Sequence, residues 1–235
     1  MTSPELIGHR GAPRERTENT LPAFERALAL GADGIELDVH LTRDGVTVVH
    51  HDAIPRAMDA TDERPTVPIA ELELATLRAL EFPDGSRIPT LAETLEVVAG
   101  RATVYVEIKA PAATETAVRE IRAARARAAV HAFDHRVALA VRALAPSLPT
   151  GILLDSYLVD PAAALRAAGA RDWWQRWEMI DAPLVQRVHE AGGRVVAWTV
   201  NDADAAARLA RLGVDALCSD VLPVVRSLAA HRSAT

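Results

Sequence analysis

The chain has 235 residues, 49 % of them hydrophobic and 25 % charged, as in an ordinary soluble globular protein that buries a substantial core. Its net charge of −6 argues against a general surface for nucleic acid or anionic membrane. The single Cys218 excludes an intrachain disulfide, and residues 1–9 lack the basic and apolar regions of a signal peptide. We therefore expect a cytoplasmic protein with no stable membrane association.

Short apolar runs typical of strands alternate along the chain with Ala- and Leu-rich helical runs. The expected strands are 6–9, 34–39, 46–50, 103–109, 128–133, 150–154, 170–174, 194–200 and 215–219. Helix start signals follow several of them, such as the capping box of Thr90 with Glu93 and the Asp160-Pro161 pair. Alternation of this kind predicts parallel strands joined by crossover helices.

The stretch 34–52 carries the strongest local signal. Its Asp44-Gly45 pair between two alternating runs predicts a hairpin with a two-residue type I′ turn. That turn would place Asp38 opposite His51, and His50 on the other face of the sheet. Four side chains would then share one face: Glu36, Asp38, His40 and His51. Acids and a histidine gathered on one surface indicate a metal or an anionic ligand.

Nine strands are one too many for an eight-stranded barrel. Because a tight hairpin cannot join parallel neighbours, we assign 46–50 to an antiparallel return strand above the carboxyl-terminal rim. The other eight strands then form a (β/α)8 TIM barrel, with 1–235 as a single domain and the proline-rich 53–89 as a small insertion at the mouth. An open doubly wound sheet is the alternative; it is disfavoured because His9-Arg10-Gly11 stands where a Gly-rich phosphate turn would follow the first strand.

Polar residues gather where the barrel strands end, which is where such barrels build their active sites. These residues are His9 and Arg10, Glu36 and Asp38, and Glu107 and Lys109, with His51 added by the hairpin. Lys109 is the chain's only lysine. Carboxylate oxygens in this number suit Mg²⁺ or Ca²⁺ better than zinc.

The pattern of motifs resembles the glycerophosphodiester phosphodiesterase family. The matching elements are His9-Arg10-Gly11, Glu18-Asn19-Thr20, 34–39 with Thr42 and Asp44-Gly45, His51-Asp52 with Arg56, 88–91, Glu107-Ile108-Lys109, 198–201, and 213–215 with Ser219-Asp220. Each motif alone is weak, but together they run in order from residue 7 to 220.

The resemblance implies a metal-dependent hydrolase of small glycerophosphodiesters that yields glycerol 3-phosphate and an alcohol. By the family's pattern, the implied roles are a Mg²⁺ or Ca²⁺ site at Glu36, Asp38 and Glu107, an acid–base pair at His9 and His51, phosphate neutralisation by Arg10 and Lys109, and stacking by Trp198. The attacking nucleophile is either water or the glycerol hydroxyl of the substrate.

Some positions depart from the family or allow another interpretation. The middle strand ends in His131-Ala132-Phe133 where the family often has Ser-Phe, and Trp173, Trp174 and Trp177 stand where a polar segment is common. We interpret His50 as a packing residue, His131 and His135 as core or surface histidines, and Asn19 as the cap of the first helix. Lys109 is also a candidate ion-pair partner of Glu107.

Two other functions are compatible with this fold. One is a phosphodiester-binding barrel without turnover, which the complete set of histidines and carboxylates disfavours. The other is a related phospholipase D or lyase that acts on a lipid headgroup and would show an apolar rim.

Overall fold

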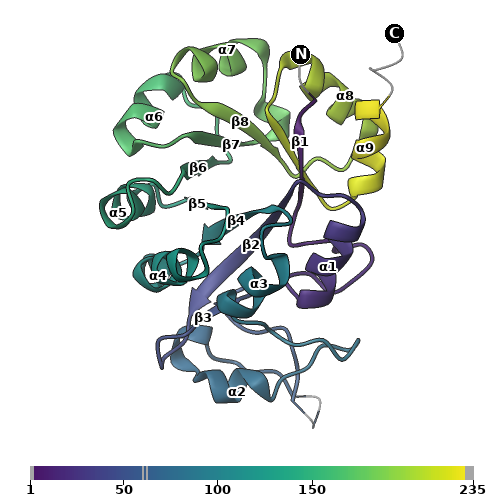
Figure 1. Ribbon diagram of the computed structural model, residues 1–235, viewed down its shortest axis with the longest axis vertical. Coiled ribbons are helices and arrows are strands. Elements are labelled where there is room, and N and C mark those ends of the chain that lie inside the picture. Colours follow the sequence, from purple (N-terminus) through teal and green to yellow (C-terminus); the bar gives the residue numbers. More distant parts are fainter. Residues whose placement is uncertain (1–2, 60, 62, 231–235) are drawn as a thin grey trace.

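The computed structural model describes residues 3–59, 61 and 63–230, and within them eight parallel strands close into a barrel (Figure 1). The barrel strands are β1 (Glu5–Gly8), β2 (Gly34–Leu41), β4 (Thr103–Ile108), β5 (Ala128–Ala132), β6 (Thr150–Leu154), β7 (Asp172–Arg176), β8 (Arg194–Trp198) and β9 (Ala216–Ser219). Each strand pairs with the next along the chain, and β1 pairs with both β9 and β2 to close the ring. The predicted (β/α)8 barrel is therefore confirmed.

Helices cover the outside of the strands (Figure 1). They are α1 (Leu21–Ala29), α3 (Leu91–Val98), α4 (Thr114–Ala124), α5 (Arg136–Leu144), α6 (Pro161–Ala168), α7 (Ala182–Glu190), α8 (Ala203–Leu212) and α9 (Leu222–Ala230). Short side chains cap several of them as expected: Thr90 and Glu93 make the capping box of α3, and Asp160 caps α6. None of the helices within the described ranges combines the length and the apolar character that crossing a bilayer requires.

Large and small side chains alternate inside the barrel. Trp174 and Tyr105 are both fully buried there and meet edge to face, with ring centroids 5.4 Å apart. Glycines make room for them: a Cβ added at Gly151 would lie 2.8 Å from the Trp174 ring, and one at Gly34 would lie 2.7 Å from the Tyr105 ring. The lower barrel is thus filled with aromatic side chains, as expected for a packed barrel interior, and polar groups gather above them.

The hairpin departs from its predicted geometry by one residue. The return strand β3 (Thr47–Val49) is antiparallel to β2 as expected, but Val39 lies opposite Val49, where the two-residue turn would have placed His50. Three residues close the loop, because Thr42 Oγ1 accepts from the Val46 amide at 2.9 Å and only Gly45 takes a positive φ, of 80°. A type I′ turn needs two such residues. The predicted pairing of Asp38 with His51 is therefore wrong.

The described part of the 53–89 segment lies beside β3 and contains two short elements, η1 (Ile69–Glu71) and α2 (Leu74–Arg78) (Figure 1). Their apolar side chains form a separate small core with β3 and with the start of the segment that leads to α3. Its buried members are Val48, Ala57, Ile69, Leu77, Leu80, Phe82 and Ile88. This core holds the segment against the hairpin.

Candidate active site

A pocket opens at the carboxyl ends of the barrel strands. It is lined by His9, Arg10, Glu36, His51, Glu107, Lys109, His131, Phe133, Leu153, Trp174, Trp198 and Cys218. Seven of the eight predicted site residues are therefore among its lining, and the eighth, Asp38, is buried immediately behind it. The strand ends bring these residues together because consecutive parallel strands finish at one rim.

Two buried carboxylates of the pocket are held close to a third. Glu36 and Asp38 project from β2 and Glu107 from β4, where Asp38 and Glu107 stand side by side in register. Burial, and then the charges of Asp38 and Glu107, raises the pKa of Glu36 well above its ordinary value. Burial and Asp38 likewise raise the pKa of Glu107 to about 7. These carboxylates repel one another, and a cation between them would relieve that repulsion.

Two positively charged side chains and one side-chain amide hold Asp38 in place. Its carboxylate lies 3.1 Å from Arg10 Nε and 3.5 Å from Lys109 Nζ, and it accepts a hydrogen bond from Asn19 Nδ2 at 2.8 Å. Burial opposes its ionisation, but Arg10 and Lys109 outweigh burial and lower the pKa of Asp38. Lys109 also donates to Glu107 at 2.8 Å, so the ion pair that we considered as the alternative role of Lys109 is present.

Asn19 has a different place from the predicted one. The N-cap of α1 is Thr20, whose hydroxyl accepts from the Ala23 amide, whereas the Asn19 side chain turns inward to Asp38. Asn19 adopts a positive φ of 57°, which aims its amide at the barrel mouth. The expectation that Asn19 caps the first helix is therefore wrong.

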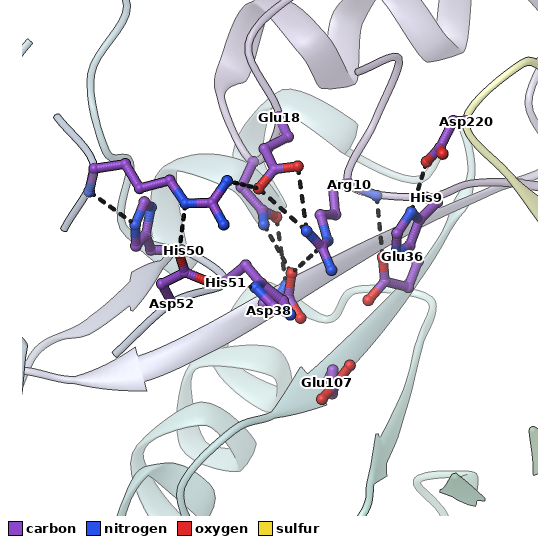
Figure 2. Close-up of polar contacts among 12 residues, drawn as sticks. His9, Arg10, Glu18, Glu36, Asp38, His50, His51, Asp52, Glu107 and Asp220 are labelled. Carbon is purple, nitrogen blue, oxygen red and sulfur yellow. Dashed lines mark hydrogen bonds and ion pairs between the residues drawn. The ribbon is translucent and has the colours of Figure 1, made fainter. Parts of the chain in front are cut away.

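Arg10 is positioned by the tight turn after β1. Its backbone N–H donates to Glu36 at 3.0 Å, and its guanidinium donates to Glu18 at 3.1 Å (Figure 2). The turn needs Gly11, which has a φ of 90° and lies so close to α1 that an added Cβ would meet the Ala23 carbonyl carbon at 2.7 Å. The backbone of Arg10 thus binds Glu36, and its guanidinium binds Glu18.

Two of the three histidines that line the pocket, His9 and His51, have matching partners. His9 Nδ1 lies 2.7 Å from Asp220, and His51 Nδ1 lies 2.7 Å from Asp52 (Figure 2). Asp220 also accepts from Asn201 at 2.7 Å. Burial alone would raise the pKa of both aspartates. Hydrogen bonds from Arg56 and His51 nevertheless lower the pKa of Asp52 to about 2, and the contact with His9 lowers the pKa of Asp220. An ionised carboxylate at Nδ1 fixes the ring and leaves Nε2 free to exchange a proton.

His51 reaches the pocket although the hairpin register differs from the predicted one. The His50 amide donates to the Asp38 carbonyl at 2.9 Å, and β3 has already ended at Val49. His51 therefore belongs to the bend after the strand, and that bend turns its ring toward Asp52 and the pocket. His51 therefore lines the pocket because of this bend and not because of strand pairing.

His50 and His40 lie outside the pocket lining. His50 stacks on Phe82 with centroids 6.1 Å apart, and its Nε2 accepts from the Arg56 amide at 3.2 Å. Burial lowers the pKa of His50 to about 4 and also lowers that of His40, whose Nε2 contacts the His51 carbonyl at 3.1 Å. His50 packs, as we interpreted it from the sequence.

His131 is a pocket residue that we did not expect from the sequence. This residue lies in register with Glu107 on the neighbouring strand β5, and its side chain is buried in the pocket. One ligand atom each from Glu36, Glu107 and His131 can be chosen so that all lie within 4.8 Å of one another. Burial lowers the pKa of His131 to about 3, so the ring is the neutral form that binds metals. The signal in the sequence was the inward alternation of Ala129, His131 and Phe133.

The three tryptophans of the 171–177 stretch have separate places. Trp173 points into the core between barrel and helices, and Trp174 forms the pocket floor against His131. Trp177 is only partly buried, and Arg208 lies over its ring at 5.8 Å. Trp198 lines the pocket and meets Phe133 edge to face, with centroids 5.7 Å apart.

Comparisons with known proteins agree with this geometry. Residues 9–223 match the model of the Glycerophosphoryl diester phosphodiesterase family. A glycerophosphodiester phosphodiesterase from Caldanaerobacter subterraneus subsp. tengcongensis is 31 % identical over 92 % of this chain and 93 % of its own. Two solved structures are also similar, both across nearly their whole length.

The first is an Oleispira antarctica phosphodiesterase in complex with its product sn-glycerol-3-phosphate, with a TM-score of 0.87, 25 % identity, and 96 % of each chain covered. The second is a glycerophosphodiester phosphodiesterase from Agrobacterium tumefaciens, with a TM-score of 0.82, 26 % identity, and 98 % of this chain and 100 % of the other covered. The match of the family model over nearly the whole chain decides the assignment. This chain belongs to the glycerophosphoryl diester phosphodiesterase family.

Proposed function

We propose that this protein hydrolyses glycerophosphodiesters to glycerol 3-phosphate and an alcohol, with the help of a divalent cation. One observation carries the proposal: two histidines, each held by a carboxylate, face buried acids and two cationic side chains in one pocket. A phosphodiester needs its charge offset, its nucleophile deprotonated and its leaving group protonated, and this pocket holds groups for all three tasks.

The donor set fits a divalent cation. Glu36 and Glu107 would hold it, and Asp38 behind them either joins as a ligand or keeps Arg10 and Lys109 in place. Carboxylates of this number favour Mg²⁺ or Ca²⁺. When bound, such a cation polarises the phosphoryl oxygen and lowers the pKa of an oxygen nucleophile.

His9 and His51 would divide the proton transfers. The Nε2 of one ring accepts the proton of the attacking oxygen, and the Nε2 of the other gives a proton to the departing alkoxide. Asp220 and Asp52 hold the rings from behind at Nδ1 and stabilise each of them when it is charged. Arg10 and Lys109 would offset the charge of the phosphate.

The apolar part of the rim would take the organic groups of the substrate. Trp198 and Phe133 meet edge to face there, and Phe133 is 46 % exposed. An aromatic wall of this kind offers a stacking surface to glycerol or to the alcohol.

The test is an assay of the purified protein against glycerophosphocholine, glycerophosphoethanolamine and glycerophosphoglycerol, with glycerol 3-phosphate measured as product. We expect turnover with Mg²⁺ or Ca²⁺, loss of turnover after EDTA treatment, and recovery when the cation is returned. Turnover that ignores both EDTA and added cations would contradict the metal site, and no product from any of the diesters would contradict the activity.

A further inference from the structure

His131 is a buried imidazole in a place where a polar ring is costly. Its side chain is about 1 % exposed and lies flat on Trp174, with ring centroids 4.1 Å apart and an interplanar angle of 9°. This stack fixes the plane of the ring. Its neighbour in register is Glu107, so the ring edge faces the carboxylates of the pocket.

Neither ring nitrogen of His131 has a hydrogen-bond partner among the described residues. The Nε2 atom lies 3.9 Å from Glu36 Oε1, which is too far for a hydrogen bond. A buried polar group without a partner costs about 1–3 kcal/mol. Packing alone therefore gives no reason for histidine at this position, because an apolar ring would stack on Trp174 without this cost.

The spacing of the three side chains matches that of ligands around one ion. Their closest ligand atoms lie within 4.8 Å of one another. Bonds of about 2.0–2.6 Å to a divalent cation place any two ligands within about 5 Å. We propose that His131 is a nitrogen ligand of the divalent cation, through Nε2, together with Glu36 and Glu107; this inference rests on the proposed cation site.

A nitrogen ligand changes which cation the site prefers. Imidazole binds Co²⁺, Ni²⁺ and Zn²⁺ well, whereas Ca²⁺ and Mg²⁺ favour oxygen ligands. The proposed site therefore has a higher affinity for Co²⁺ relative to Ca²⁺ than a site made only of carboxylates. His131 acts as a determinant of metal selectivity in this chain.

The test compares the wild-type protein with His131→Ala and His131→Phe, after chelator treatment and dialysis. Isothermal titration gives the Kd for Co²⁺ and for Ca²⁺, and NMR of the Co²⁺ form detects the paramagnetically shifted N–H proton of a bound imidazole. Phe keeps the stack on Trp174 but has no nitrogen, which guards against an Ala variant that fails to fold. His135→Ala is the matched control, because His135 contacts the Leu153 carbonyl and does not line the pocket.

We expect both His131 variants to lose at least about tenfold in Co²⁺ affinity, to lose much less in Ca²⁺ affinity, and to lose the shifted N–H signal. His135→Ala should keep all three. An unchanged signal and an unchanged Co²⁺ affinity in a folded His131 variant would overturn the inference and leave the cation site intact. A wild-type protein that binds neither cation would overturn the proposed cation site as well.

Discussion

The Nδ1 atom of His9 lies 2.7 Å from Asp220, a residue 211 positions further along the chain. The two meet because β1 pairs with β9, so that the first strand and the last strand of the barrel end side by side. Asp220 is fixed in turn by Asn201, whose side chain donates to its carboxylate and accepts from its amide. The ring of His9 is thus oriented by the closure of the barrel itself.

We expect Asp220→Asn to lower kcat by about 10²-fold or more, with a smaller change in KM. Asparagine removes the negative charge that stabilises the His9 ring when charged, and its amide favours the wrong tautomer. Steady-state kinetics from pH 5 to 9 would measure both effects.

The control for this change is Asp215→Asn. It breaks a similar contact, between His189 and Asp215 at 2.9 Å, outside the pocket lining. Its kcat should stay near the wild-type value in the folded protein. Equal losses in the two variants would show that Asp220 supports the fold and not the reaction.

A second prediction concerns adjacent histidines. His51→Ala should abolish turnover while the circular dichroism spectrum stays native, because His51 lines the pocket and Asp52 holds its ring at Nδ1. His50→Ala should leave turnover measurable and instead lower the melting temperature, because His50 is buried against Phe82. Comparable losses of activity in both variants would contradict the separation of roles.

The sequence predicted the fold well because its signals are local. The ends of every expected strand lie within two residues of the ends of an observed strand. The helix caps at Thr90 and Asp160 are also the expected ones. Alternation also places Glu36 and Glu107 inside the barrel. These features depend on neighbours in the chain, which a sequence displays directly.

Other features depend on contacts that a sequence pattern does not display. The hairpin register changed because the hydroxyl of Thr42 completes a three-residue loop. Asn19 turned inward because Asp38 offers it a buried partner, which outweighs its value as a helix cap. We interpreted His131 as a core or surface histidine because the sequence does not show which residue of β4 lies beside it. The register of β4 and β5 places it next to Glu107, and only the structure gives that register.

A third prediction concerns the cation site through stability. Cation binding should raise the free energy of unfolding of the wild-type protein by about 2.7 kcal/mol at a concentration 100 times Kd. Glu36→Gln should remove most of this gain, because it deletes a charged ligand. The metal-free variant should be at least as stable as the metal-free wild type at pH 8, because glutamine avoids the cost that burial, Asp38 and Glu107 impose on an ionised carboxylate at this position.

Thermal denaturation with and without Mg²⁺, Ca²⁺ and EDTA would measure this difference. Glu81→Gln is the control, because Glu81 is an exposed residue that pairs with Arg87 on the surface. It should retain the full stabilisation by cations. If Glu36→Gln were stabilised as strongly as the wild type, Glu36 would not be a ligand.

A last prediction follows from the buried ring of His50. Its Nε2 accepts from the Arg56 amide, and burial lowers its pKa from 6.5 to about 4, so the folded protein resists protonating it. Between pH 6.5 and 4 the unfolded chain therefore binds a proton that the folded chain does not. The contribution of His50 to the free energy of unfolding is therefore fully present above pH 6.5 and is lost as the pH is lowered through this window.

The shift corresponds to a loss on the order of 3 kcal/mol by pH 4. His50→Gln retains an acceptor for the Arg56 amide but does not titrate, so its stability relative to the wild type should rise by this amount as the pH falls from 7 to 4. Urea denaturation of both proteins at several pH values, in EDTA, would isolate the effect of His50 from that of the cation site. A stability difference that stays constant with pH would show that His50 titrates normally in the folded protein.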